Sequence, residues 1–148
     1  MQRVQSFHAA DAPALTAAQL DACLADPAEL PQARLRLHPS LFVLASAHAV
    51  VSLWAAHQSG SPELDLERLD PAQHETAMVC RRDMEVAIYR IEPGAASFIA
   101  ALQRNAGFGA AIEAALATQP GLDLPATLAL LLRAGAIAGI TTPRRTNP

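Results

Sequence analysis

The chain has 148 residues, 51% of them hydrophobic, and its 11 basic and 14 acidic residues leave a net charge of -3 at pH 7. A chain of this length fits one domain with short appendages and buries a core without help from a disulfide or a metal. All the basic residues are Arg, and the negative net charge excludes a general attraction to phosphate backbones or anionic lipid. Aromatic residues are scarce and Ala is abundant, which favours helices packed closely on small side chains.

The N-terminal region, residues 1–33, is expected to be a lead-in that contains one short helix. Residues 1–14 show no clear period, whereas Thr16 to Gln19 has the pattern of a capping box that opens a helix. Asp26-Pro27 marks its end. The first residues lack the apolar segment of a signal peptide, so we expect a cytoplasmic protein.

The next segment predicts two short strands and a helix. Arg34 to Leu37 alternates with period two, and an apolar run from Leu41 to Leu44 follows the His38-Pro39 break. Residues 47–57 then have a helical pattern with a buried stripe of Val50, Val51 and Trp54. The longest apolar stretch, residues 41–56, is interrupted by polar residues and is too short to span a membrane.

The C-terminal half predicts a β-hairpin followed by three helices. Residues 76–82 and 85–91 are runs rich in β-branched and aromatic residues, joined at Asp83-Met84. Helices are expected from Pro93, after Gly107, and from Leu124 to Ala134, the last capped by Asp123 and followed by Gly135. This order predicts an α+β fold with a winged-helix-like core at about residues 75–140, and a disordered tail at residues 141–148.

No set of residues has the spacing that catalysis or metal binding requires. The five His residues form no HxxxH pair, and Cys23 and Cys80 lie outside any CxxC spacing, so we expect free thiols, no metal and no cofactor, with a disulfide left open. No nucleophile elbow or phosphate-binding loop is present. The segment from Gly107 to Ile112 follows a helix rather than a strand, which favours a helix–helix turn over a dinucleotide loop. The sequence therefore predicts a protein that is not an enzyme.

Two groups of residues are candidates for binding a partner. Arg81 and Arg82, with Arg90 on the partner strand, form a basic cluster that either blunts a sheet edge or binds an acidic peptide. The third predicted helix is apolar nearly all round, so its Leu residues are either core or a partner surface. The candidate residues on that helix are Leu128, Leu131 and Leu132.

Residues 34–140 resemble the C-terminal half of the HvfC family, which includes MbnC-like partner proteins. The matching segments are Leu35-Arg36-Leu37-His38-Pro39-Ser40-Leu41, Val50-Val51-Ser52-Leu53-Trp54-Ala55-Ala56-His57, the Arg-bearing hairpin, and Leu130-Leu131-Leu132-Arg133-Ala134-Gly135-Ala136-Ile137. The resemblance implies a non-catalytic partner of a multinuclear iron-dependent oxidase that modifies Cys residues in a ribosomally made precursor peptide. The hairpin and three helices are also similar to PqqD-type recognition domains, in which a leader peptide adds as a strand beside the sheet and packs on the third helix. Family members commonly carry a helical N-terminal half, and here a short helix is expected before Arg34.

Three hypotheses follow. The leading one is an adaptor that binds a precursor peptide and presents it to the oxidase. The second is a winged-helix DNA-binding regulator, although Arg133 is the only basic residue of the third helix, too little for tight binding. The third is a structural oligomerisation domain that uses the same apolar helix.

Overall fold

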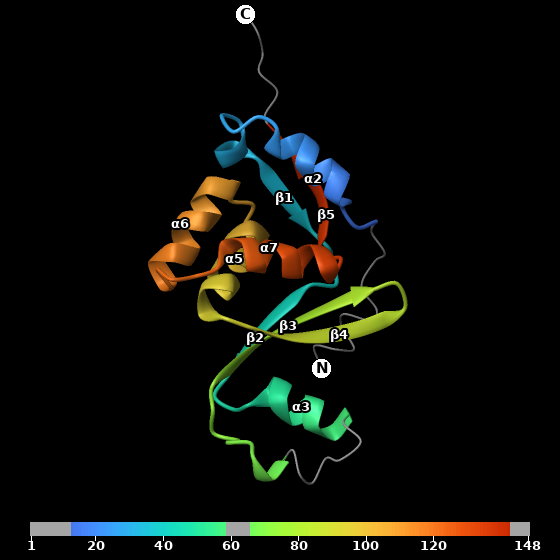
Figure 1. Ribbon diagram of the computed structural model, residues 1–148, viewed down its shortest axis with the longest axis vertical. Helices are drawn as coiled ribbons and strands as arrows, with labels where there is room; N and C mark the ends of the chain where they lie inside the picture. The colour runs from blue at the N-terminus through green and yellow to red at the C-terminus, as the bar shows by residue number, and fades with distance from the viewer. Residues whose placement is uncertain (1–12, 59–65, 143–148) are drawn as a thin grey trace, which may run out of the picture.

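The computed structural model describes residues 13–58 and 66–142, and it has a mixed α+β architecture (Figure 1). Its helical elements are α2 (Ala17–Leu24), the 3-10 helix η1 (Leu30–Gln32), α3 (Val50–Gln58), α5 (Pro93–Gln103), α6 (Phe108–Thr118) and α7 (Leu124–Arg133). Its strands are β1 (Arg34–Leu37), β2 (Phe42–Ser46), β3 (Glu75–Arg82), β4 (Glu85–Ile91) and β5 (Ile137–Thr141). The predicted α+β class is confirmed.

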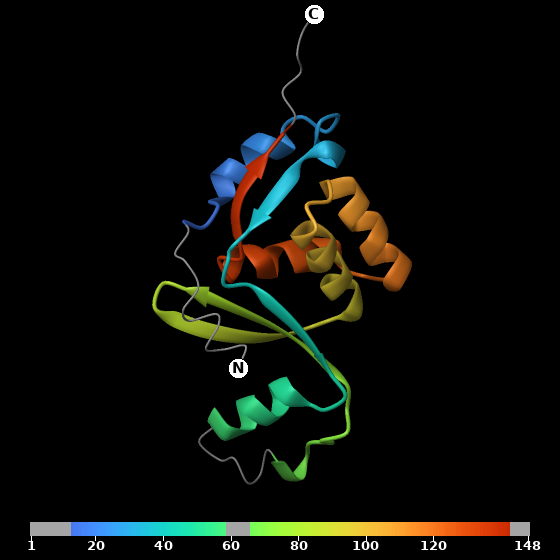
Figure 2. The ribbon, with the colours of Figure 1, turned by 180° about the vertical axis from the view of Figure 1, so that it is seen from behind.

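The strands form two antiparallel sheets. A three-stranded sheet has the order β2-β3-β4, and a two-stranded sheet pairs β1 with β5. The chain passes from β1 into β2 and thereby joins the two sheets, as Figures 1 and 2 show from opposite sides. The three-stranded sheet separates α3, on one side, from α5 and α7 on the other (Figures 1 and 2).

The two faces of the three-stranded sheet are covered by different parts of the protein. Residues paired across neighbouring strands share a face, and successive residues of one strand alternate between faces. Met78 and Cys80 therefore point to the same face as Tyr89 and Ile91, and all of these belong to or pack against the main core with Phe98 of α5. The opposite face carries Ala77, Val79 and the buried Glu75 below α3.

Local signals explain the helix ends. The Thr16 hydroxyl accepts the Gln19 N–H and the Gln19 side chain accepts the Thr16 N–H, which completes the predicted capping box. The Asp123 carboxylate accepts the Ala126 N–H at 2.9 Å and caps α7. Gly135 follows α7 with φ +65°, a left-handed conformation that glycine adopts without strain.

The structure corrects several expectations. Ile137–Thr141 forms β5 beside β1, so Thr141, predicted to begin a disordered tail, belongs to a strand. Residues 1–12, 59–65 and 143–148 lie outside the described part of the chain. β2 pairs with β3, so the predicted two-stranded hairpin is a three-stranded sheet.

Candidate functional site

β4 is an edge strand of the three-stranded sheet: its described pairing is to β3 alone. The two-residue turn at Asp83-Met84, with φ +55° at Asp83, places Arg82 opposite Glu85. In a two-residue hairpin the pair that flanks the turn exchanges backbone hydrogen bonds, and along the ladder such pairs alternate with non-hydrogen-bonded ones. The backbone groups of Ala87 and Tyr89 therefore point toward β3.

Ser40 provides an independent check on this alternation. It lies just before β2, and its hydroxyl accepts the Arg81 N–H at 2.9 Å, in the place where a longer β2 would have continued the ladder. The backbone groups of Arg81 thus face β2, and those of Arg82 face β4, as the turn requires. The same hydroxyl lies 2.7 Å from His38 Nδ1, so the His-Pro-Ser segment has a structural role in ending the sheet.

The outward-facing backbone groups of β4 are those of Val86, Ile88 and Arg90. Among the residues that the structure describes, none hydrogen-bonds to them. The strand between Glu85 and Arg90 carries no charge and no Pro, and its side chains from Val86 to Tyr89 are all half-buried. An uncharged, regular edge of this kind is a template for pairing with another strand.

A small hollow of about 180 Å³ lies beside the end of β4, where the chain enters α5 and passes below α7. Its apolar walls come from all three elements and the loop before α7: Ile91, Ala95, Leu122, Ala126 and Leu130. The polar residues Arg90, Glu92, Asp123 and Thr127 also line it. The side chain of Ile91 faces this side of the sheet, so the open edge and the hollow are contiguous.

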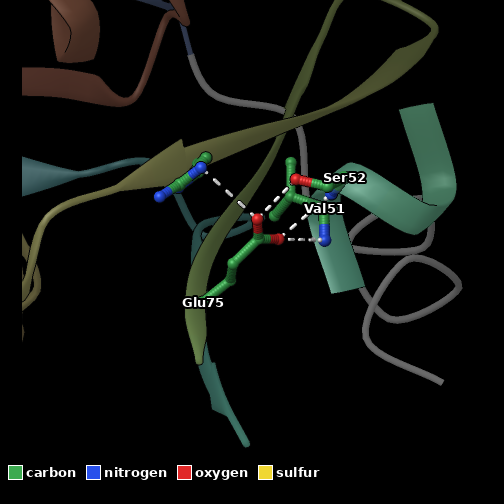
Figure 3. Close-up of polar contacts among 4 residues, drawn as sticks. Val51, Ser52 and Glu75 are labelled. Carbon is green, nitrogen blue, oxygen red and sulfur yellow. Dashed lines mark hydrogen bonds and ion pairs between the residues drawn. The ribbon is translucent and has the colours of Figure 1, made fainter. Parts of the chain in front are cut away.

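On the other face of the same sheet, the side chain of Glu75 holds helix α3 in place. Its carboxylate accepts the Val51 N–H at 2.9 Å and the Ser52 N–H at 3.0 Å, together with the Ser52 hydroxyl, at the first turn of α3 (Figure 3). Arg90 Nη1 lies 3.5 Å from the same carboxylate, whose side chain is fully buried. Glu75 therefore caps α3 from a neighbouring strand and holds it against β3 and β4.

The pKa of Glu75 reflects these contacts. Burial acts to raise it, but the hydrogen bonds from Ser52 and Val51 and the positive charge of Arg90 outweigh burial and hold the pKa below its ordinary value of 4.5. The carboxylate is therefore ionised at neutral pH, which is the state that caps a helix N-terminus best.

The predicted basic cluster does not form. Arg90 is opposite Ala77, whereas Arg82 is beside the turn at the other end of the hairpin. Strand alternation places Arg81 and Arg82 on opposite faces, and in the sheet Arg81 is buried while Arg82 is exposed, so the two guanidinium groups do not share a surface. Arg82 Nη1 donates to the Arg133 carbonyl at 2.8 Å, so this guanidinium caps the C-terminus of α7.

The predicted leucine surface is partly core. Leu131 is 1% exposed and belongs to the main core, while Leu128 and Leu132 are half-buried and pack against it. The leucine of α7 that lines the hollow is Leu130, which was not among the predicted partner-binding residues. Because all faces of α7 carry apolar residues, helical periodicity alone gave no signal to choose among them.

Cys23 and Cys80 are free thiols, and burial raises the pKa of Cys80 above its ordinary value of 9.0 despite contacts with Ser40 and the Arg81 carbonyl. Within residues 13–58 and 66–142, no three His, Cys, Asp or Glu side chains are grouped so that they could hold a metal ion. Across the same residues no helix combines the length and apolar character needed to cross a membrane.

Comparison with known proteins identifies no relative. No family model matches the chain, and the searches of curated proteins and of solved structures gave no significant match. Within its described residues, the chain is an α+β protein whose edge strand β4 pairs with β3 alone and lies beside an apolar hollow.

Proposed function

We propose that the chain is a non-catalytic binding protein that takes up an extended peptide as an added strand along β4. The observation that carries this proposal is the set of outward-facing backbone groups at Val86, Ile88 and Arg90, next to the hollow lined by Ile91 and Leu130. Backbone pairing provides affinity without demanding a particular side chain, and pockets for alternate side chains provide selectivity.

The two faces of the sheet would recognise different side chains of the added peptide strand. Alternate residues of an added strand point toward the α7 side, where an apolar side chain at the end of β4 enters the hollow between Ile91 and Leu130. The intervening residues point toward α3, where the exposed guanidinium of Arg90, already paired with Glu75, is available to an acidic side chain. Arg81 has no part in this scheme because it is buried.

The resemblance of residues 34–140 to the HvfC family supports the identity of the peptide and of the second partner. On this basis we propose a ribosomally made precursor peptide as the ligand and a multinuclear iron-dependent oxidase as the protein to which it is presented. The oxidase would supply the metal and the chemistry of Cys modification. The role of this chain is to position the peptide. The DNA-binding alternative shares the order of a hairpin followed by three helices, but Arg133 is the only basic residue of α7.

Binding of a fluorophore-labelled, Cys-containing precursor peptide to the full chain tests the proposal. Ile88→Pro removes an outward-facing N–H and no hydrogen bond to β3, and Leu130→Glu places a charge in the hollow. Each change should weaken binding by about tenfold or more, since one lost hydrogen bond or a buried unpaired charge costs about 1–2 kcal/mol.

Leu116→Glu is the matched control, because Leu116 is exposed on α6 and lies outside the hollow. It should leave the affinity unchanged. A folded Ile88→Pro variant that binds the precursor as tightly as the parent would refute strand addition at β4.

A further inference from the structure

The three-stranded sheet has a second open edge, along β2. The register pairs Phe42, Leu44 and Ser46 with residues of β3 whose backbone groups face β2. Arg81 belongs to the same alternating set of β3, because its N–H also faces β2. The alternation of the ladder therefore directs the N–H and C=O groups of Val43 and Ala45 away from the sheet. In the described part of the chain, no backbone or side-chain group hydrogen-bonds to them.

This edge lacks the features that normally protect an edge strand. β2 reads Phe-Val-Leu-Ala-Ser, with no charged residue and no Pro, and its pairing with β3 is regular throughout. Leu44 is 40% exposed, and Ala45 is exposed beside it. A protein in solution rarely leaves such a strand uncovered, because it pairs readily with another strand.

We propose that β2 pairs with β2 of a second copy of this chain, antiparallel and across a twofold axis at Leu44. In this register Val43 of one copy lies opposite Ala45 of the other, and the reverse pair follows by symmetry. Both members of each pair have outward-facing backbone groups, so each pair exchanges its hydrogen bonds and every outward group of Val43 and Ala45 is satisfied. A shift by one residue would oppose an outward-facing residue to an inward-facing one and lose these bonds.

The same register accounts for the exposure of Leu44. The two Leu44 residues form the central pair, which is not hydrogen-bonded, and in such pairs the Cα atoms approach to about 4.5 Å with the side chains in contact. Each leucine then covers the other. The hydrophobic side chain that the isolated chain leaves at its sheet edge thus becomes part of the interface.

The composition of β2 favours a second copy over a foreign partner. An isologous interface needs a self-complementary strand, and a short uncharged strand opposes no like charges when it meets itself. β4 differs, because Glu85 and Arg90 flank its apolar part and the hollow beside Ile91 offers a pocket for a side chain of different chemistry.

This interface is independent of peptide binding. Pairing through β2 would join the sheets of both copies into one continuous sheet and leave β4 at each outer edge. Dimerisation is measured without any peptide, so its failure would leave the proposed function standing, and the reverse also holds.

Sedimentation equilibrium of the full chain tests the proposal, with Leu44→Lys as the disruptive variant and Leu116→Lys as the control. Both leucines are 40% exposed, so the two substitutions are matched in exposure and in charge. The parent and Leu116→Lys should reach a monomer–dimer equilibrium, and Leu44→Lys, which opposes two like charges, should weaken it by about tenfold or more. A parent that stays monomeric at high micromolar concentration, or a dimer that Leu44→Lys leaves intact, would overturn the proposal.

Disulfide trapping reports on the register even if Leu44→Lys fails to fold. In a Cys23→Ser background, Leu44→Cys brings two thiols together at a Cα separation within the range that a disulfide spans, while Cys80 remains buried. Mild oxidation should yield a covalent dimer of Leu44→Cys and far less of Leu116→Cys. Equal trapping of the two variants, or a dimer that Ile88→Lys disrupts in place of Leu44→Lys, would assign the contact elsewhere and refute pairing through β2.

Discussion

Replacing the buried carboxylate of Glu75 by the isosteric amide tests how α3 is held to the sheet. Glu75→Gln keeps the volume of the side chain but removes the charge that accepts the Val51 and Ser52 N–H groups and the Ser52 hydroxyl. The amide also presents an NH2 group to donors that need an acceptor. Removing these contacts should loosen the first turn of α3.

The expected loss in the free energy of unfolding follows from these contacts. Hydrogen bonds to a charged group contribute about 1.5–3 kcal/mol each, and the amide oxygen retains part of them, so we expect Glu75→Gln to lower the free energy of unfolding by about 2–3 kcal/mol. The pair with Arg90 adds less than about 1 kcal/mol, because the Arg90 side chain is 55% exposed. Ser52→Ala, which removes one of the donors, should cost about 1 kcal/mol.

The stabilisation that Glu75 contributes decreases as the pH falls. Because the pKa of Glu75 is lower in the folded chain than its ordinary value of 4.5, the stabilisation is complete above 4.5 and is lost as the pH falls through the folded value. The difference between the parent and Glu75→Gln should therefore be constant near neutral pH and shrink in acid. Urea unfolding at a series of pH values measures it, with the exposed Glu85→Gln as control. Equal midpoints for the two variants at pH 7 would refute this account of Glu75.

Three further outcomes are expected. Leu131→Asp should abolish folding as judged by circular dichroism, because it buries an unpaired charge in the main core, whereas Leu116→Asp at an exposed site should change stability by less than about 0.5 kcal/mol. Asp123→Ala should cost about 1 kcal/mol in urea unfolding through the lost cap of α7, and a cost near zero would show that the cap is unimportant. Duplex DNA should not bind at physiological salt, given the net charge of -3, and a sequence-specific gel shift at sub-micromolar protein would favour the regulator hypothesis.

The local elements of the fold were predictable because their signals are local. The capping box at Thr16, the Asp123 cap and the glycine after α7 mark helix ends within a few residues, and all are observed. The hairpin from β3 to β4 was predicted from its two runs of strand-forming residues, and its turn forms at Asp83-Met84, the junction between them. Each depends on interactions between residues close in the sequence.

The pairings that were missed depend on residues far apart in the chain. β5 is a short Ala- and Gly-containing segment whose partner, β1, lies about a hundred residues earlier, so no local pattern identifies it. Arg81 illustrates the same limit for the site: the alternation of a strand states that Arg81 and Arg82 face opposite sides, but only the full sheet shows which side is the interior. Glu75 directly precedes the predicted strand at residues 76–82, and its role as a cap for α3 appears only in three dimensions.

Amide hydrogen exchange along β4 is the measurement that tests the central claim most directly. In the free chain the Ala87 and Tyr89 amides should exchange slowly, because they pair with β3, while those of Val86, Ile88 and Arg90 should exchange fast. Saturating precursor peptide should slow the fast set and leave the slow set nearly unchanged, the pattern that an added strand produces. Protection confined to other elements, with the Val86, Ile88 and Arg90 amides still exchanging fast in the complex, would contradict strand addition at β4.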